Sequence, residues 1–121
     1  MFDHIGLKVK DIAASVRFFT AALEPLGFVP GPADETSASF GPPGAPVFWL
    51  GRGKTDGGVH IAFVSRRRAA VDAFYAKGLD AGGRDNGPPG LRPDYGPTYF
   101  AAFLIDPDGN NVEAVCHEEA P

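Results

Sequence analysis

The tetrapeptide His4-Ile5-Gly6-Leu7 reappears 56 residues later as His60-Ile61-Ala62-Phe63. The same offset, held without a gap, aligns four further pairs of similar segments: Ala13-Ala14 with Ala69-Ala70, Phe18-Phe19 with Phe74-Tyr75, Leu23 with Leu79, and Gly27 with Gly83. An internal repeat fixes the architecture of a chain, because each copy adopts the same supersecondary structure. The sequence therefore predicts two similar modules.

Each module begins with a strand and a helix. Residues 2–9 carry apolar side chains at alternate positions, which predicts a strand. Apolar residues spaced three or four apart then predict a helix over 12–23. The second copy repeats this pattern as a strand over 59–65 and a helix over 67–77, which we expect Gly78 to end.

Turn-rich sequence follows each helix and predicts short strands, over 27–30, 36–40 and 46–51 in the first module and over 80–95, 98–105 and 111–116 in the second. Module 1 (about 1–55) and module 2 (about 56–121) are thus βαβββ units. We expect one α+β domain over 1–121, in which the two modules form a cupped mixed sheet with the helices outside.

Composition limits the possible partners and compartments. The 121 residues carry a formal net charge of −4, which argues against a nucleic acid partner, because phosphates require a basic surface. The single cysteine excludes an internal disulfide framework and a multi-cysteine zinc site. No apolar run reaches the ~18 residues of a membrane span, and charges interrupt the N-terminus where a signal peptide would be apolar. We expect a cytoplasmic protein that binds a small molecule and no membrane.

The repeat places a histidine at the same position of each first strand. Alternation puts His4 and His60 on the face opposite the helix, where small residues two positions later leave room for a ligand or a metal. Glu113 lies within an apolar strand, and a buried carboxylate is costly unless it is paired or bound to metal. Each of these residues alone is more often structural or exposed. Together they have the composition of a facial triad, which favours a metal site with open coordination positions.

The ends of the two modules also align when their turn glycines, Gly44 and Gly109, are superposed. Phe48 then falls on Glu113, so we expect Phe48 on the cavity side, where it would line a substrate pocket with Trp49 beside it. Phe48 cannot coordinate a metal, and a symmetric four-ligand site is therefore not expected from these positions.

Two polar residues of the second module are further candidates for contact with a substrate. Tyr99 is a candidate catalytic residue, as a proton donor or as a phenol that orients an anion. Arg92 could bind a substrate carboxylate through two parallel hydrogen bonds. Core packing of the aromatic residues and solvation of an arginine in a Gly/Pro-rich loop are the competing interpretations.

The two ends of the chain resemble a known family. The opening Phe2-Asp3-His4-Ile5-Gly6-Leu7-Lys8-Val9 and the closing Asp106-Pro107-Asp108-Gly109-Asn110-Asn111-Val112-Glu113 resemble the glyoxalase/bleomycin resistance/extradiol dioxygenase superfamily, also called vicinal oxygen chelate proteins. The resemblance covers nearly the whole chain and implies paired βαβββ modules around a cupped site. It implies metal ligands at His4, His60 and Glu113. Glyoxalase I-like members use a fourth ligand where Phe48 stands, so ordinary glyoxalase I activity is not expected.

Two classes of function follow from this resemblance. The leading expectation is a metal-dependent enzyme of lyase, isomerase or dioxygenase type, which acts on a small oxygen-chelating substrate and uses a divalent Fe, Mn, Zn, Ni or Co ion. In this enzyme Glu113 would be both a metal ligand and a catalytic residue that shuttles a proton. The alternative is a metal-free protein of the bleomycin-resistance type that binds or sequesters a small molecule. We also expect a homodimer, since two small modules leave sheet edges and apolar faces for a partner to cover. Pairing of the modules within one chain or across two stays open.

Overall fold

The structure of the protein, a computed structural model, describes residues 1–119; residues 120–121 of the expected second module lie outside it. The first module contains β1 (Ile5–Val9), α1 (Ile12–Leu23), a 3-10 turn (Glu24–Leu26), β2 (Val29–Pro30), β3 (Ser37–Gly41) and β4 (Phe48–Arg52). The second contains β5 (His60–Ser65), α2 (Arg68–Asp80), β6 (Arg84–Leu91), β7 (Phe100–Ile105) and β8 (Asn111–Cys116). No helix in this part of the chain is both long and apolar enough to cross a membrane.

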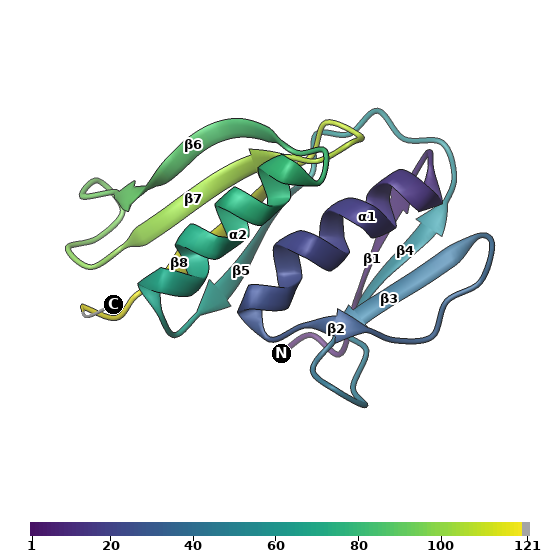
Figure 1. The fold of residues 1–121 in the computed structure, drawn as a ribbon, viewed down its shortest axis with the longest axis horizontal. Helices are drawn as coiled ribbons and strands as arrows, with labels where there is room; N and C mark the ends of the chain where they lie inside the picture. The colour runs from purple at the N-terminus through teal and green to yellow at the C-terminus, as the bar shows by residue number, and fades with distance from the viewer. Residues whose placement is uncertain (120–121) are drawn as a thin grey trace.

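Each module folds into its own four-stranded mixed sheet. The strand orders are β1-β4-β3-β2 and β5-β8-β7-β6, and the first strand of each module pairs in parallel with its last strand. The two helices lie side by side and cover one side of the paired sheets (Figure 1). The predicted α+β class and the two βαβββ modules are confirmed.

Local chemistry explains where the helices begin and end. Asp11 caps α1, since its carboxylate accepts a hydrogen bond from the backbone N–H of Ala14 at 3.2 Å. Contrary to the prediction, α2 does not end at Gly78 but continues to Asp80. A Cβ at Gly78 would lie 2.3 Å from Cδ1 of Leu104 on β7. This glycine therefore allows close packing of the helix on the sheet.

The two modules share one hydrophobic core. The ring of Phe63 on β5 contacts two rings of the first module, Phe28 and Phe48, at centroid distances of 5.7 and 5.5 Å. At the other end of the junction, the backbone N–H of Lys10 donates to the carboxylate of Asp108 at 3.1 Å. The modules therefore act as one packed unit, which leaves the sheet faces opposite the helices for binding.

Candidate functional site

Each sheet packs one face against the helices and leaves the opposite face open. On β1, Leu7 and Val9 are buried under the helices, while Gly6 and Lys8, which alternate with them, are exposed. On β5 the exposed positions are those of His60 and alternate residues after it, as the sequence predicted. Ala62 is one of them, and it pairs directly with Glu113 of β8, so Glu113 shares the open face with His60.

Glu113 is the centre of the open face of the second sheet. Its side chain is only 2% exposed, and both carboxylate oxygens have partners. Nε2 of His60 lies 2.9 Å from Oε1, and the Tyr99 hydroxyl donates to Oε2 at 2.5 Å. These contacts compensate the cost of burying a carboxylate in an apolar strand. The structure thus brings together three predicted site residues.

The environment of Tyr99 keeps its phenol protonated. Burial, the hydrogen bond to Glu113 and the negative charge of that carboxylate, in this order, raise the pKa of Tyr99 to about 12. The phenol is therefore a hydrogen-bond donor at neutral pH. The ring of His117 lies against the Tyr99 ring at a centroid distance of 5.3 Å. His117 is exposed, and its contact with Tyr99 was not predicted, although its position four residues after Glu113, with the same strand parity, was an available signal.

The turn before β8 fixes the position of Glu113. Asp106 is 1% exposed, and its carboxylate accepts hydrogen bonds from the backbone N–H and the side-chain amide of Asn110 at 2.8 and 2.9 Å. The amide oxygen of Asn110 in turn accepts from the backbone N–H of Val59, just before β5, at 3.1 Å. The turn is therefore bonded to the residue that precedes His60, which holds the two strands in register.

His4 lies apart from this cluster. Its Nδ1 is 2.6 Å from a carboxylate oxygen of Asp3, and the side chain is 61% exposed. Across residues 1–119, no three His, Cys, Asp or Glu side chains lie close enough together to hold a metal ion. Of the three predicted ligands, the structure therefore brings His60 and Glu113 together, while His4 stands on the first module.

A largely apolar cleft of about 250 Å³ separates His4 from the second sheet. His4 and Ala62 lie on its walls, and four phenylalanine rings line it: Phe2, Phe28, Phe48 and Phe63. The cleft therefore extends from the first module to the strand beside Glu113.

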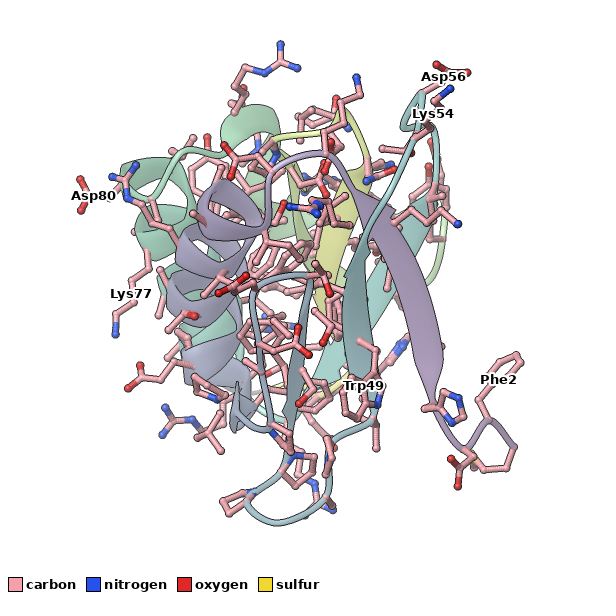
Figure 2. The ribbon with its side chains drawn as sticks, turned by 90° about the vertical axis from the view of Figure 1, so that its right-hand side faces the viewer. Phe2, Trp49, Lys54, Asp56, Lys77 and Asp80 are labelled. Atoms are coloured by element: carbon pink, nitrogen blue, oxygen red, sulfur yellow. The ribbon has the colours of Figure 1, made fainter. Side chains whose placement is uncertain are left out.

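The expected alignment of Phe48 with Glu113 is wrong by one residue. In the first sheet Gly6 pairs with Trp49, and the equivalent pair in the second sheet is Ala62 with Glu113. Trp49 therefore occupies the position equivalent to Glu113 and lies on the side of the sheet away from the helices (Figure 2). Since tryptophan offers no lone pair to a metal, the first module still lacks a fourth ligand.

Phe48 is 2% exposed and packs on the helix side, although it also bounds the cleft. The error comes from the turns. Seven residues, 41–47 and 105–111, separate equivalent paired positions in the two modules. The glycine with positive φ stands one place earlier in module 1, at Gly44 (φ 77°), than in module 2, at Gly109 (φ 89°). Superposing the glycines therefore shifts the strand register by one.

Arg92 lies near the same open face, in a second pocket of about 390 Å³. Phe103, which pairs with Glu113 across β7 and β8, lines this pocket together with Arg92. Its ring centroid is 6.4 Å from that of His60 and 5.3 Å from the Arg92 guanidinium carbon. Phe103 was not predicted as a site residue, because its place beside Glu113 depends on the β7–β8 register.

Solved structures with this fold were found by comparison, whereas no curated protein matches the chain. A glyoxalase/bleomycin resistance protein from Albidiferax ferrireducens T118 is 29% identical, with a TM-score of 0.81 over 96% of this chain and 98% of that one. A glyoxalase/bleomycin resistance protein/dioxygenase family enzyme from Burkholderia phytofirmans PsJN, 14% identical with a TM-score of 0.73 over 96% and 98% of the two chains, shares the fold.

The family assignment itself comes from the sequence. The family model of the glyoxalase/bleomycin resistance protein/dioxygenase superfamily matches residues 1–114, which span both modules and end just after Glu113. The match agrees with the paired βαβββ architecture and with the cluster on the open face of the second sheet. The chain therefore belongs to the glyoxalase/bleomycin resistance protein/dioxygenase superfamily.

Proposed function

We propose that this protein is a divalent-metal-dependent enzyme that acts on a small, oxygen-bearing organic molecule at the open face of the second module. The observation that carries the proposal is the nearly buried carboxylate of Glu113 with Nε2 of His60 at 2.9 Å. Burying a carboxylate in an apolar strand costs free energy, and such carboxylates typically form an ion pair, coordinate a metal or take part in catalysis.

The donor set at this position fits a divalent ion. His60 supplies an imidazole nitrogen and Glu113 a carboxylate oxygen, from adjacent parallel strands. Fe, Mn, Zn, Ni and Co ions all accept this mixture of ligands. A bound ion would act as a Lewis acid toward a substrate oxygen.

The third ligand in this proposal is His4, contributed by a second copy of the chain in a homodimer. Two exposed apolar side chains support this arrangement. Val64 is 70% exposed on the open face of β5, and Phe2, which precedes β1, is 84% exposed and points away from the helices (Figure 2). Exposed apolar side chains of this kind favour coverage by a partner. The exposure of His4 leaves its ring accessible to such a partner.

Three more side chains have proposed roles toward the substrate. Tyr99, held protonated beside Glu113, would donate a hydrogen bond or a proton to a substrate oxygen. Trp49 on the open face and Phe48 at the wall of the cleft would contact apolar parts of the molecule.

Elemental analysis of metal content tests the proposal. Protein purified without chelator and dialysed against each of the five ions should hold about one ion per chain. His60→Ala and Glu113→Gln should lose most of it. The chain has three histidines, so His117→Ala is a matched control that should keep its metal. Equal metal content in wild type, His60→Ala and Glu113→Gln would contradict the proposal.

Mixing two inactive variants tests the contribution of a second copy. A His4→Ala subunit and a Glu113→Gln subunit each lack one ligand. If sites form across copies, a dimer of the two contains one intact site, and an equal mixture should recover about a quarter of the wild-type metal after subunit exchange. Recovery of no metal would contradict a cross-copy site.

A second candidate is the metal-free binding protein, which the aromatic cleft of about 250 Å³ favours. In this case an apolar ligand would occupy the cleft that Phe28, Phe48 and Phe63 line. Fluorescence titration with the neutral dye Nile red separates the two functions. Binding that survives Glu113→Gln and metal removal but weakens at least tenfold in Phe48→Leu supports the binding protein. Dye binding that is unaffected by Phe48→Leu contradicts it.

A further inference from the structure

The pocket around Arg92 is separate from the aromatic cleft but adjoins Glu113. It has a volume of about 390 Å³, and amide groups of Asn86 and Asn111 line it beside the guanidinium. Asn111 lies two residues before Glu113 on β8, so the two side chains share a face. A molecule bound here would reach from Arg92 toward the Glu113 cluster.

The guanidinium of Arg92 is held in one place by its surroundings. Its Nη1 donates to the carbonyl of Gly90 at 2.9 Å, and its Nη2 donates to the carbonyl of Pro88 at 2.6 Å. A Cβ added at Gly87 or at Gly90 would lie 3.2 Å from a terminal nitrogen of the guanidinium. The two glycines therefore leave the space that the guanidinium fills, and the Phe103 ring stacks on it.

This arrangement leaves the arginine with charge and hydrogen-bonding capacity to spare. An arginine carries five N–H donors, and these two carbonyls take two of them. Among residues 1–119, no carboxylate oxygen lies within 4.0 Å of the Arg92 nitrogens. A half-buried cation that is positioned in advance and lacks an acidic partner is suited to bind an anion.

We propose that Arg92 binds the carboxylate of a small organic acid, with the amides of Asn86 and Asn111 as neighbouring donors. The proposal rests on the proposed function in one respect: the same molecule would present its remaining oxygens to the Glu113 cluster. A planar guanidinium matches a planar carboxylate through two parallel hydrogen bonds. Phe103 and Tyr95 line the pocket and favour an acid with a flat apolar body.

Asp94 limits the negative charge of the anion that this pocket can bind. It lines the same pocket and is exposed, and it adds a negative charge near the bound anion. Repulsion from this carboxylate disfavours a dianion more than a monoanion. We therefore expect the pocket to prefer a monocarboxylate over inorganic phosphate.

Calorimetric titration with benzoate and benzamide tests the subsite, since these probes have the same shape and differ in charge. Wild type should bind benzoate at least tenfold more tightly than benzamide or inorganic phosphate. Arg92→Gln should lose at least tenfold in benzoate affinity and change benzamide affinity less than twofold. Arg84→Gln is the matched control, because it removes the same charge from an exposed position at the start of β6, the strand that ends one residue before Arg92; it should leave benzoate binding unchanged.

Several outcomes would overturn the proposal. Equal wild-type affinity for benzoate and benzamide would do so even if Arg92→Gln failed to fold, and so would equal benzoate loss in Arg92→Gln and Arg84→Gln. Tighter binding of phosphate than of benzoate would show a site for inorganic anions instead. Titrations in metal-free buffer and with Glu113→Gln separate the two proposals: benzoate binding that persists there supports the Arg92 subsite even if no metal binds at Glu113.

Discussion

Phe48 and Trp49 are neighbours in sequence, but their side chains lie on opposite faces of β4, and this difference predicts different costs of truncation. Phe48 is 2% exposed, and its ring lies 5.1 Å from that of Phe19 and 5.5 Å from that of Phe63. Removing a buried phenylalanine ring costs about 3–5 kcal/mol, from lost burial and the cavity left behind. Trp49 is only partly buried on the open face, and Trp49→Ala should cost about 1 kcal/mol.

Urea unfolding followed by far-ultraviolet circular dichroism measures both costs. With a slope of about 2 kcal/mol per molar urea, Phe48→Ala should lower the unfolding midpoint by about 2 M and Trp49→Ala by about 0.5 M. If Phe48→Ala lacks a folded baseline, Phe48→Leu replaces it and should still lower the midpoint more than Trp49→Leu. An equal or larger loss for Trp49 would refute the strand register on which the comparison with Glu113 depends.

A double-mutant cycle with Phe19→Leu tests the orientation of Phe48 and Trp49 in a second way. Its result does not depend on whether a partner covers Trp49 on the open face. Because the Phe48 and Phe19 rings touch, Phe48→Leu and Phe19→Leu should couple by at least about 0.5 kcal/mol. The stability losses of Trp49→Leu and Phe19→Leu should be additive, since the two side chains lie on opposite sides of the sheet. Coupling of Phe19 with Trp49 and not with Phe48 would reverse the assigned orientation.

Two further predictions concern the site and the core. The tyrosinate absorbance of wild type minus that of Tyr99→Phe should titrate near pH 12. Because the folded-state pKa of Tyr99 is raised from 10.0, this residue should contribute stability that is present below pH 10 and lost between pH 10 and 12. A difference titration centred near pH 10 would be inconsistent with burial beside Glu113. Gly78→Ala should lower the midpoint of thermal unfolding. Overpacking of the new methyl group against Leu104 costs about 1–3 kcal/mol, which exceeds the gain of up to about 1 kcal/mol in helix propensity. A raised midpoint would show that close packing against Leu104 is not the reason for glycine at this position.

The repeat carried most of the predictable information about the fold. Hydrophobic alternation and helical spacing depend only on local sequence, and the offset of 56 residues made each module support the other. The strand-helix order and the equivalence of β1 with β5 were therefore predictable. Gly78 was misread because a glycine that ends a helix and one that allows close packing look alike in sequence.

The site was predictable only for residues at equivalent positions of the repeat or with an unusual charge in an apolar strand. His60 and Glu113 followed from the repeat and from the unusual charge in an apolar strand. The orientation of Phe48 did not, because turns with glycines at different positions can join strands in the same register. The contacts of Phe103 and His117 required the β7–β8 pairing, and the distance of His4 from the cluster required the packing of the two modules, which local patterns do not encode.

In the proposed function, His60 and Glu113 bind the metal ion together with His4 as the third ligand. Long-range ¹H–¹⁵N correlation spectra of the imidazole rings test it directly, because the chain has only three histidines. On addition of about one equivalent of Zn²⁺, the ring nitrogens of His4 and His60 should shift while those of His117 stay in place, and Glu113→Gln should abolish both shifts. Unchanged signals of His60 in wild type, or shifts that persist in Glu113→Gln, would contradict the account.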